Sequence, residues 1–147
     1  MAGAGTQRAA GVCETAGAAP ILIHLDTSLL IDALTGPRRS ARDLRRVLED
    51  GERLRVSALV LYEWLRGPRV EAEISDQEAL FPSAGAAAFG PAEAAVAADL
   101  YRIVPKPRHR EFDLAVAACA LVDEAALWTL NPKDFKDIPG LNLFGPA

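Results

Sequence analysis

The order of apolar and polar positions along the chain predicts strands that alternate with helices. Residues 21–25 form a short, nearly continuous apolar run, which is typical of a strand buried on both faces of a parallel sheet. His24 interrupts this run, and we interpret it as a core histidine rather than a ligand. Further strands are predicted at residues 54–56, 79–81 and 126–130, with an edge strand at residues 141–144.

Helices are predicted between these strands. The first begins at Thr27 and ends before Gly36-Pro37, because Thr favours a helix start and Gly-Pro cannot continue a helix. Ser40 and Ser57 are the candidate N-caps of the next two helices, and Gly67-Pro68 ends the second of these. The predicted helices after the first cover residues 40–50, 57–66, 71–77 and 91–101, the stretch from about residue 113 to residue 124, and a short piece at residues 131–134.

This alternation defines the fold class. Strand and helix units of this length build an α/β fold, here a three-layer α/β/α domain with a central, mostly parallel sheet. Ligands of such sheets bind outside the carboxyl ends of the strands, at the point where the strand order reverses. Candidate functional residues should therefore follow strands or begin helices.

Four acidic residues meet this condition. Asp26 follows the first strand, Glu63 lies in the third helix, Asp113 begins a late helix and Asp134 follows the last long strand. Carboxylates brought together from distant segments repel one another, and hard oxygen ligands suit Mg²⁺ or Mn²⁺. The pattern therefore predicts a divalent-metal site, and phosphodiester hydrolysis is the chemistry that such a site commonly serves.

Each of these acids also has a simpler structural interpretation. Asp26 and Asp113 could be helix N-caps, Asp134 could stabilise a turn, and Glu63 could be an exposed helical residue. Trp64 is interpreted as a core or oligomer-contact residue rather than a base-stacking one, and the same holds for Trp128. The remaining acids that we interpret as surface charges are Asp32, Asp43, Asp99, Glu111, Asp123 and Asp137.

Composition and charge limit how the chain could bind nucleic acid. The 147 residues, half of them hydrophobic, suffice for one domain. A net charge of −4 argues against binding by bulk positive charge, so any nucleic-acid contact must be local. His109, in a Pro- and Arg-rich loop, could meet RNA phosphate or belong to a flexible polar loop. A solvated helix face and a phosphate- or partner-binding face both fit the basic cluster of Arg38, Arg39, Arg42, Arg45 and Arg46.

The remaining features concern the cellular setting. Cys13 and Cys119 do not indicate a disulfide framework, so we expect a cytoplasmic protein. No apolar run approaches the roughly 20 residues that span a bilayer, and no membrane partner is expected. Residues 1–20 are rich in Gly and Ala and are expected to be a disordered extension or to reflect an upstream start codon, with the domain covering residues 21–147.

These motifs together resemble the PIN-domain ribonucleases, and among them the VapC-like toxins of type II toxin–antitoxin systems. The resemblance covers about residues 21–144 and consists of four blocks in the family's order and spacing. In this sequence the blocks are Leu25-Asp26-Thr27-Ser28; Ser57, Glu63 and Gly67; residues 113–120, with Val116 in place of Ile; and Thr129, Asn131, Asp134 and Phe135 followed by Ile138, Gly140 and Leu141.

The resemblance implies a function and its partners. Asp26, Glu63, Asp113 and Asp134 would be catalytic and would bind Mg²⁺ or Mn²⁺, supported by Thr27 and Asn131. The expected activity is endoribonucleolytic cleavage of structured RNA such as tRNA or rRNA, leaving a 5′-phosphate and a 3′-hydroxyl. The protein would act as a homodimer, and a VapB-like cognate antitoxin would lay a peptide over the active-site groove.

Three departures from the family pattern keep alternatives open. Val60 replaces a frequent Thr, Asn131 stands where many relatives have Asp, and the loop of residues 105–110 is unusually rich in Pro and Arg. One alternative is therefore a PIN domain with weak or no catalysis that binds nucleic acid or protein. Another is a phosphoryl-transfer enzyme with Asp26 as nucleophile, although Ser28 stands where one large phosphatase class has a second Asp.

Overall fold

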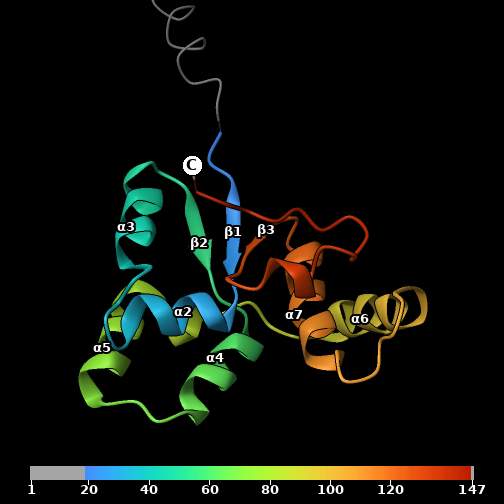
Figure 1. Ribbon diagram of the computed structural model, residues 1–147, viewed down its shortest axis with the longest axis horizontal. Helices are drawn as coiled ribbons and strands as arrows, with labels where there is room; N and C mark the ends of the chain where they lie inside the picture. The colour runs from blue at the N-terminus through green and yellow to red at the C-terminus, as the bar shows by residue number, and fades with distance from the viewer. Residues whose placement is uncertain (1–18, 147) are drawn as a thin grey trace, which may run out of the picture.

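A parallel sheet of three strands forms the centre of the described chain. The computed structural model describes residues 19–146, so Cys13 and nearly all of the predicted extension of residues 1–20 lie outside it. The strands are β1 (Leu22–Leu25), β2 (Arg53–Arg55) and β3 (Ala126–Trp128), in the order β2-β1-β3. Ile23 of β1 pairs with Leu54 on one side and Ala126 on the other. The central strand β1 therefore ends between two neighbours that point the same way (Figure 1).

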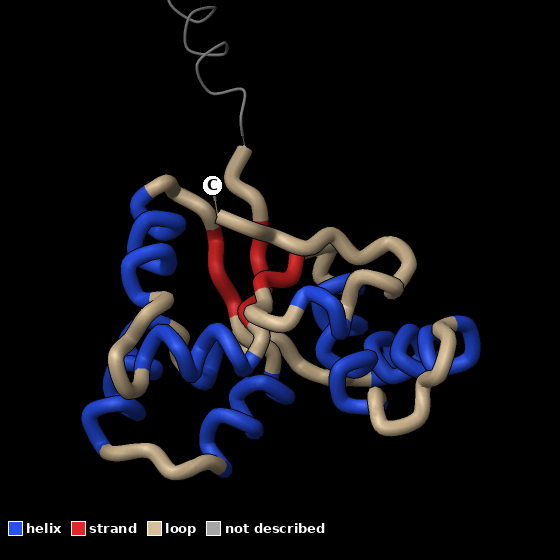
Figure 2. Tube along the Cα trace, in the orientation of Figure 1, coloured by secondary structure: helices blue, strands red, loops and turns tan. Residues whose placement is uncertain are grey.

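Helices cover this sheet on both sides. Figures 1 and 2 show α2 to α5 gathered toward one side of the sheet and α6 and α7 on the other, which confirms the predicted α/β architecture. None of the helices within residues 19–146 has the length and apolar character needed to cross a bilayer. The helices are α2 (Thr27–Leu34), α3 (Ala41–Glu49), α4 (Ala58–Arg66), α5 (Glu71–Leu80), α6 (Pro91–Ile103) and α7 (Glu111–Val122), with short 3₁₀ turns η1 (Ser83–Gly85) and η2 (Pro132–Asp134).

Of the two serines predicted to cap helices, one caps its helix and the other does not. Ser57 caps α4, since its hydroxyl accepts a hydrogen bond from the backbone N–H of Val60 at 3.2 Å. Ser40 occupies the N-cap position of α3, but its hydroxyl donates to Asp32 at 2.6 Å instead of capping. Asp32 is thus a partner that ties α2 to the start of α3, and not only a surface charge.

Two of the strand predictions differ from the structure: one was wrong, and in the other only a single bridge forms. Residues 79–81 do not form a strand, because α5 continues to Leu80 and the buried Gln77 side chain donates to the carbonyl of Phe81 at 2.9 Å. Residues 141–144 form one isolated parallel bridge, between Leu127 and Leu143, rather than a regular edge strand. Short apolar runs are compatible with either a strand or a helix end, and here the helix prevails.

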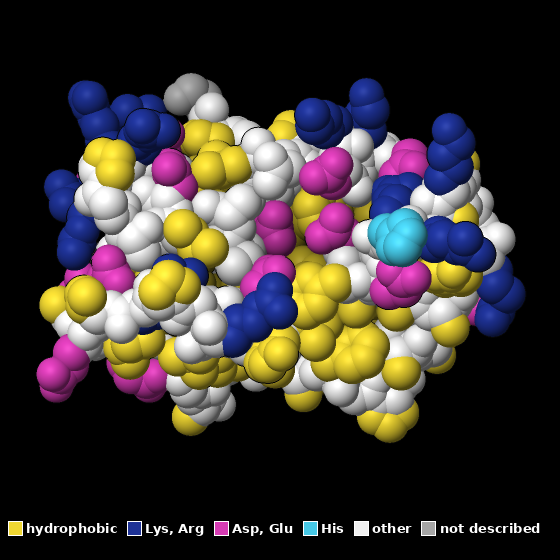
Figure 3. Space-filling model, turned by 60° about the horizontal axis from the view of Figure 1, so that its bottom comes forward, with side chains coloured by type: hydrophobic (Ala, Val, Ile, Leu, Met, Phe, Trp, Pro, Cys, Tyr) yellow, Lys and Arg dark blue, Asp and Glu magenta, His cyan; other side chains and the backbone are white. Residues whose placement is uncertain are grey.

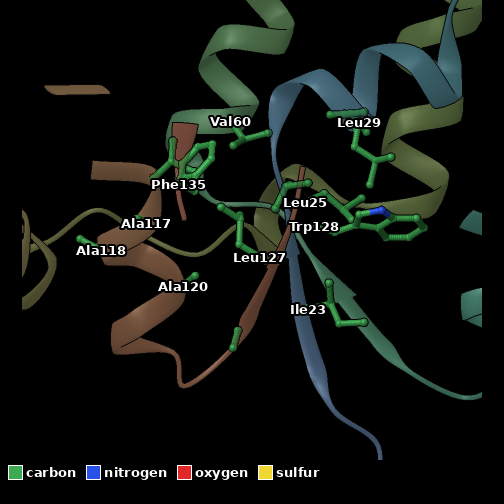
Figure 4. Packing of buried hydrophobic residues seen from close by; sticks show 14 of the residues in the cluster. Ile23, Leu25, Leu29, Val60, Ala117, Ala118, Ala120, Leu127, Trp128 and Phe135 are labelled. Carbon is green, nitrogen blue, oxygen red and sulfur yellow. The ribbon is translucent and has the colours of Figure 1, made fainter. Parts of the chain in front are cut away.

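The hydrophobic core lies between the sheet and both helical layers. Figure 4 shows Leu25 and Leu127 of the strands between Leu29 of α2 and the alanines of α7. Small alanine side chains on α7 let this helix approach the sheet closely. Trp64 and Trp128 are buried, as predicted for core residues, and the ring of Trp128 packs edge-to-face on Phe144 at 5.1 Å.

A buried polar network crosses the sheet at β1. His24 is 1% exposed, which confirms its assignment to the core, and its Nε2 lies 2.7 Å from an oxygen of Asp123. The same oxygen accepts a hydrogen bond from Arg55 at 2.7 Å, and Arg55 also donates to the carbonyl of Gly85. The interpretation of Asp123 as a surface charge was therefore wrong, because this carboxylate joins α7 to β1 and β2.

Candidate acidic site

Asp26 lies at the carboxyl end of the central strand and at the start of α2. Its backbone N–H donates to the carbonyl of Trp128 at 2.9 Å, which extends the pairing with β3 by one residue. The residue has the N-cap position of α2, but its carboxylate makes no capping hydrogen bond. Asp26 is 8% exposed and lines a cleft, so its surroundings differ from those of an ordinary helix cap.

Hydroxyl groups from two distant segments hold the Asp26 carboxylate. Thr129 Oγ1 donates to Asp26 Oδ2 at 2.7 Å, and Ser28 Oγ donates to the same oxygen at 3.1 Å. Ser28 and Thr129 in turn accept hydrogen bonds from the backbone N–H groups of Leu130 and Asn131. The chain segment after β3 is thereby tied to the carboxylate of Asp26.

Thr27, which the resemblance expects to support the acids, lines the cleft but makes no side-chain hydrogen bond to Asp26. The hydroxyl of Thr27 is buried and finds no hydrogen-bond partner among the described residues. Ser28 and Thr129 stand beside Thr27 and Asn131 in the sequence motifs, but only the fold shows which hydroxyls meet Asp26. Asn131 contributes its backbone N–H to Thr129 and also lines the cleft.

The cleft beside Asp26 has a volume of about 420 Å³. Glu63 of α4 and Asp113 of α7 line it together with Asp26, so acids from three separate segments meet there. Asp134 does not line this cleft; it lies in η2, close enough for its charge to act on Asp113. The full lining is Asp26, Thr27, Ser28, Ile31, Glu63, Arg66, Gly67, Arg69, Asp113 and Asn131.

The electrostatics of Asp113 reflect this convergence. Burial is the main cause that raises the pKa of Asp113 to about 6, and repulsion from Asp26, Asp134 and Glu63 adds to it. The positive charge of Arg110 opposes the shift. Burial also raises the pKa of Asp26, although the hydrogen bond from Thr129 acts against it. Both carboxyl groups therefore lose their protons less readily than a solvated Asp does.

Two arginines line the side of the cleft formed by α4. Arg66 lies 3.5 Å from Glu63 in an exposed ion pair. Arg69 folds back over the ring of Trp64, with its guanidinium carbon 4.3 Å from the ring centre, and donates to the carbonyl of Trp64. A Cβ at Gly67 would stand 2.8 Å from the Arg69 guanidinium, so the glycine of the second motif leaves room for this arginine.

Arg110 joins the segments on the opposite side of the acids. Its guanidinium donates to both carboxylate oxygens of Asp137, at 2.6 and 2.9 Å, and to the carbonyl of Asp134 at 3.0 Å. A further hydrogen bond reaches the carbonyl of Pro105 at 3.2 Å. This fork holds η2, which carries Asp134, against the start of α7, which carries Asp113. Sequence reasoning did not assign this function to Arg110, and Asp137 is its fixed partner rather than a free surface charge.

The donor chemistry of the site suits a hard divalent cation. Carboxylate oxygens are the ligands that Mg²⁺ and Mn²⁺ prefer, and mutual repulsion among these acids would be relieved by a cation. Within residues 19–146, however, no three His, Cys, Asp or Glu side chains come close enough together to enclose an ion. Figure 3 shows several acidic side chains near the middle of one face, beside hydrophobic and basic side chains.

Fold and site together define an α/β domain with an acidic cleft at the carboxyl edge of a parallel sheet. The sequence of residues 23–141 matches the PIN domain family. The chain is also 32% identical over 120 residues to Ribonuclease VapC19 of Mycobacterium tuberculosis, an alignment that covers 80% of this chain and 94% of that protein. This chain is therefore a member of the PIN domain family.

Solved structures share the same fold. VapBC2 from Rickettsia felis, bound to a DNA fragment from its promoter, matches with a TM-score of 0.65 and 20% identity, over 84% of this chain and 98% of that one. A toxin–antitoxin complex from Klebsiella pneumoniae matches with a TM-score of 0.64 and 23% identity, over 85% and 98% of the two chains. At these identities the similarity establishes the fold, which agrees with the predicted three-layer α/β/α class.

Proposed function

We propose that this protein is a metal-dependent endoribonuclease and the toxin of a toxin–antitoxin pair. The observation that carries the proposal is the meeting of Asp26, Glu63 and Asp113 in one cleft, with Asp134 close to Asp113. Membership of the PIN domain family and the similarity to a protein named as a VapC ribonuclease support it.

In this proposal the four acids hold Mg²⁺ or Mn²⁺, directly or through water. The bound cation would neutralise charge on the phosphate and favour ionisation of the attacking water. Ser28 and Thr129 position the Asp26 carboxylate by hydrogen bonds, and Arg110 positions Asp134 by holding its carbonyl. The acids belong to four different segments, so the site forms only in the folded chain.

The proposed reaction is hydrolysis of an RNA phosphodiester bond. The water oxygen bonds to phosphorus, the bond from phosphorus to the 3′ oxygen breaks, and that oxygen takes a proton, leaving 5′-phosphate and 3′-hydroxyl ends. Glu63 and Asp113 both face the cleft and are the residues proposed to orient the water. The substrate proposed is tRNA or rRNA, cut where unstacked bases are accessible.

The proposed partners are a cognate antitoxin and a second copy of this chain. Solved relatives are complexes described as VapBC or toxin–antitoxin assemblies, which supports a VapB-like partner that covers the acidic cleft. Exposed Tyr62 and Leu65 on α4, which are 59% and 47% exposed, support a homodimer through this helix. Light scattering of the purified protein tests the dimer, because a monomeric mass at micromolar concentration would exclude it.

Cleavage of total cellular RNA tests the proposed activity. The purified, antitoxin-free protein is incubated with RNA and Mg²⁺ or Mn²⁺, with EDTA as one control, and product ends are mapped. Asp113→Asn should abolish discrete cuts, whereas the matched variant Asp99→Asn, in an exposed pair with Arg102, should cut like wild type. Equal cutting by wild type and Asp113→Asn, or no metal-dependent cutting by wild type, would refute the proposal.

A second candidate function is a PIN domain that binds nucleic acid or protein without catalysis. It is favoured by Val60 and Asn131, which stand where the family pattern often has Thr and Asp. Calorimetric titration with Mn²⁺ separates the two candidates. Saturable binding that Asp26→Asn removes supports the enzyme, and no binding at millimolar Mn²⁺ supports the binding module.

A further inference from the structure

A short cationic loop projects beside the acidic site. It consists of residues 106–109, between α6 and α7, and is called the arm below. Lys106, Arg108 and His109 are exposed in it. No salt bridge within residues 19–146 involves Lys106 or Arg108. The charges of Arg108 and His109 do act on the nearby carboxyl group of Glu111, but without a direct ion pair.

The arm has a constrained backbone. Lys106 and His109 have left-handed backbone conformations, with φ values of 51° and 70°, which non-glycine residues adopt at a cost. Pro107 restricts the chain between them. Arg110 closes the loop, because its backbone N–H donates to the carbonyl of Pro107 and its side chain donates to the carbonyl of Pro105. The exposed cations are therefore presented by a closed loop rather than by a free tail.

The same arginine connects the arm to the acids. Arg110 directly follows the arm, holds the carbonyl of Asp134 and precedes Asp113 by three residues. Its charge acts on the carboxyl groups of Asp113 and Asp134. Figure 3 shows a histidine with basic side chains above it and to its right and acidic side chains below it on this face. The arm thus forms one border of the acidic site.

The negative charge of the chain and of the site explains why RNA binding needs cations beside the acids. The chain carries a net charge of −4, and four acids line or flank the site, so phosphate groups are repelled from it. The arginines on the opposite side are already engaged, Arg66 with Glu63 and Arg69 with the ring and carbonyl of Trp64. Among the described residues beside the site, Lys106 and Arg108 form no ion pair, and Lys133 in η2 likewise forms none.

We propose that the arm binds the phosphate backbone of single-stranded RNA and holds the strand across the acidic cleft. Lys106 and Arg108 each contact one phosphate, and Arg110 keeps the arm in position. This inference rests on the proposed ribonuclease function. The arm would supply the cationic surface with which this acidic protein binds the RNA phosphates.

Binding of a fluorescein-labelled single-stranded RNA, followed by anisotropy at several salt concentrations, tests the arm. The protein carries Asp113→Asn throughout, so that the RNA stays intact. Adding Lys106→Gln and Arg108→Gln should lower the slope of log affinity against log salt by about 1.4, since each lost contact removes roughly 0.7 for single strands. Affinity at 0.1 M salt should fall roughly 10-fold. The melting temperature should not change, because both side chains are exposed.

The matched control removes the same charge from α3 and the segment just before it. Arg39→Gln with Arg42→Gln changes two exposed arginines on the other side of the sheet (Figure 1) and should leave the salt slope unchanged. An unchanged slope in the arm variant, or an equal loss in the control variant, would overturn the proposal. The latter result would assign RNA binding to Arg39 and Arg42 or to net charge alone.

Cleavage by proteins with an intact Asp113 separates this proposal from the proposed function. The arm variant should raise KM with kcat unchanged, because phosphate contacts away from the cut bond bind substrate and transition state alike. One outcome is that wild type cuts RNA, Asp113→Asn does not, and the arm variant has the wild-type KM. That outcome would refute RNA binding by the arm and leave the proposed ribonuclease function supported. If wild type does not cut, the proposed function fails, and RNA anisotropy still decides whether the arm binds.

Discussion

At the scale of single residues, closeness in sequence to Asp26 does not decide which hydroxyl group hydrogen-bonds to its carboxylate. Thr27 is adjacent to Asp26 in sequence but its buried hydroxyl has no partner among the described residues. Thr129 is 103 positions away and donates to the carboxylate at 2.7 Å. A charge-assisted hydrogen bond of this kind orients the acid and favours its ionised form.

Substituting these two threonines with valine tests the distinction. Thr129→Val should lower kcat/KM by about 10-fold, because the loss of a hydrogen bond to a charged group costs about 1.5–3 kcal/mol. In this variant the increase of the rate with pH should also occur at a higher pH, since the hydrogen bond from Thr129 lowers the pKa of Asp26. Thr27→Val should keep the wild-type rate and stability. The interpretation would be wrong if the Thr27 variant lost more activity than the Thr129 variant in the same RNA-cleavage assay.

At the scale of secondary-structure elements, Asp123 joins a helix to the sheet. Burial alone would raise the pKa of Asp123, but hydrogen bonds from His24 and Arg55 hold it below its usual value. Burial lowers the pKa of His24 despite the neighbouring carboxylate, so the neutral ring donates from Nε2. This network orients β1, and therefore Asp26, relative to α7, which carries Asp113.

Replacing this carboxylate should destabilise the fold. Asp123→Asn weakens two short hydrogen bonds and leaves Arg55 without its counter-charge, so the free energy of unfolding should fall by about 2 kcal/mol. Asp99→Asn, in an exposed ion pair on α6, should change it by less than about 0.5 kcal/mol. Urea denaturation at pH 7 measures both. Equal stability of the two variants would contradict the structural role of Asp123.

At the scale of the whole molecule, the acidic site gathers like charges from four segments at a cost in stability. The pKa of Asp113 is raised to about 6, so the folded protein holds this proton more tightly than the unfolded chain does. Ionisation of Asp113 therefore disfavours folding. The penalty is absent where both states are protonated and is fully present above pH 6 or so.

The variant Asp113→Asn should accordingly be more stable than wild type in EDTA at pH 7.5. We expect a gain of about 1 kcal/mol, reduced from the full value of the pKa shift because the carboxylate is half-buried. The gain should vanish near pH 3.5, where Asp113 is protonated in wild type. Urea denaturation at both pH values measures it, and an equal gain at both would show that charge is not the cause. Mg²⁺ should stabilise wild type more than the variant if the acids bind it.

The sequence alone determined the order of the strands and helices and the positions of two acidic residues within them, because these depend on local chemistry. Apolar runs and start and stop residues predicted the strand and helix order, since periodicity, Ser57 as a cap and Gly67-Pro68 as a terminator act over a few residues. The same order placed Asp26 at a strand end and Asp113 near a helix start. The resemblance to PIN domains rested on these same positions.

Only the tertiary structure decided which side chains meet. The hydrogen bond from Thr129 to Asp26 and that between His24 and Asp123 join residues 103 and 99 positions apart. The fork of Arg110 on Asp137 and the end of α5 at Leu80 likewise depend on neighbours or burial that periodicity does not encode. A pattern along the chain specifies direction and exposure, whereas hydrogen-bond partners and pKa shifts depend on distances that exist only once the segments have packed.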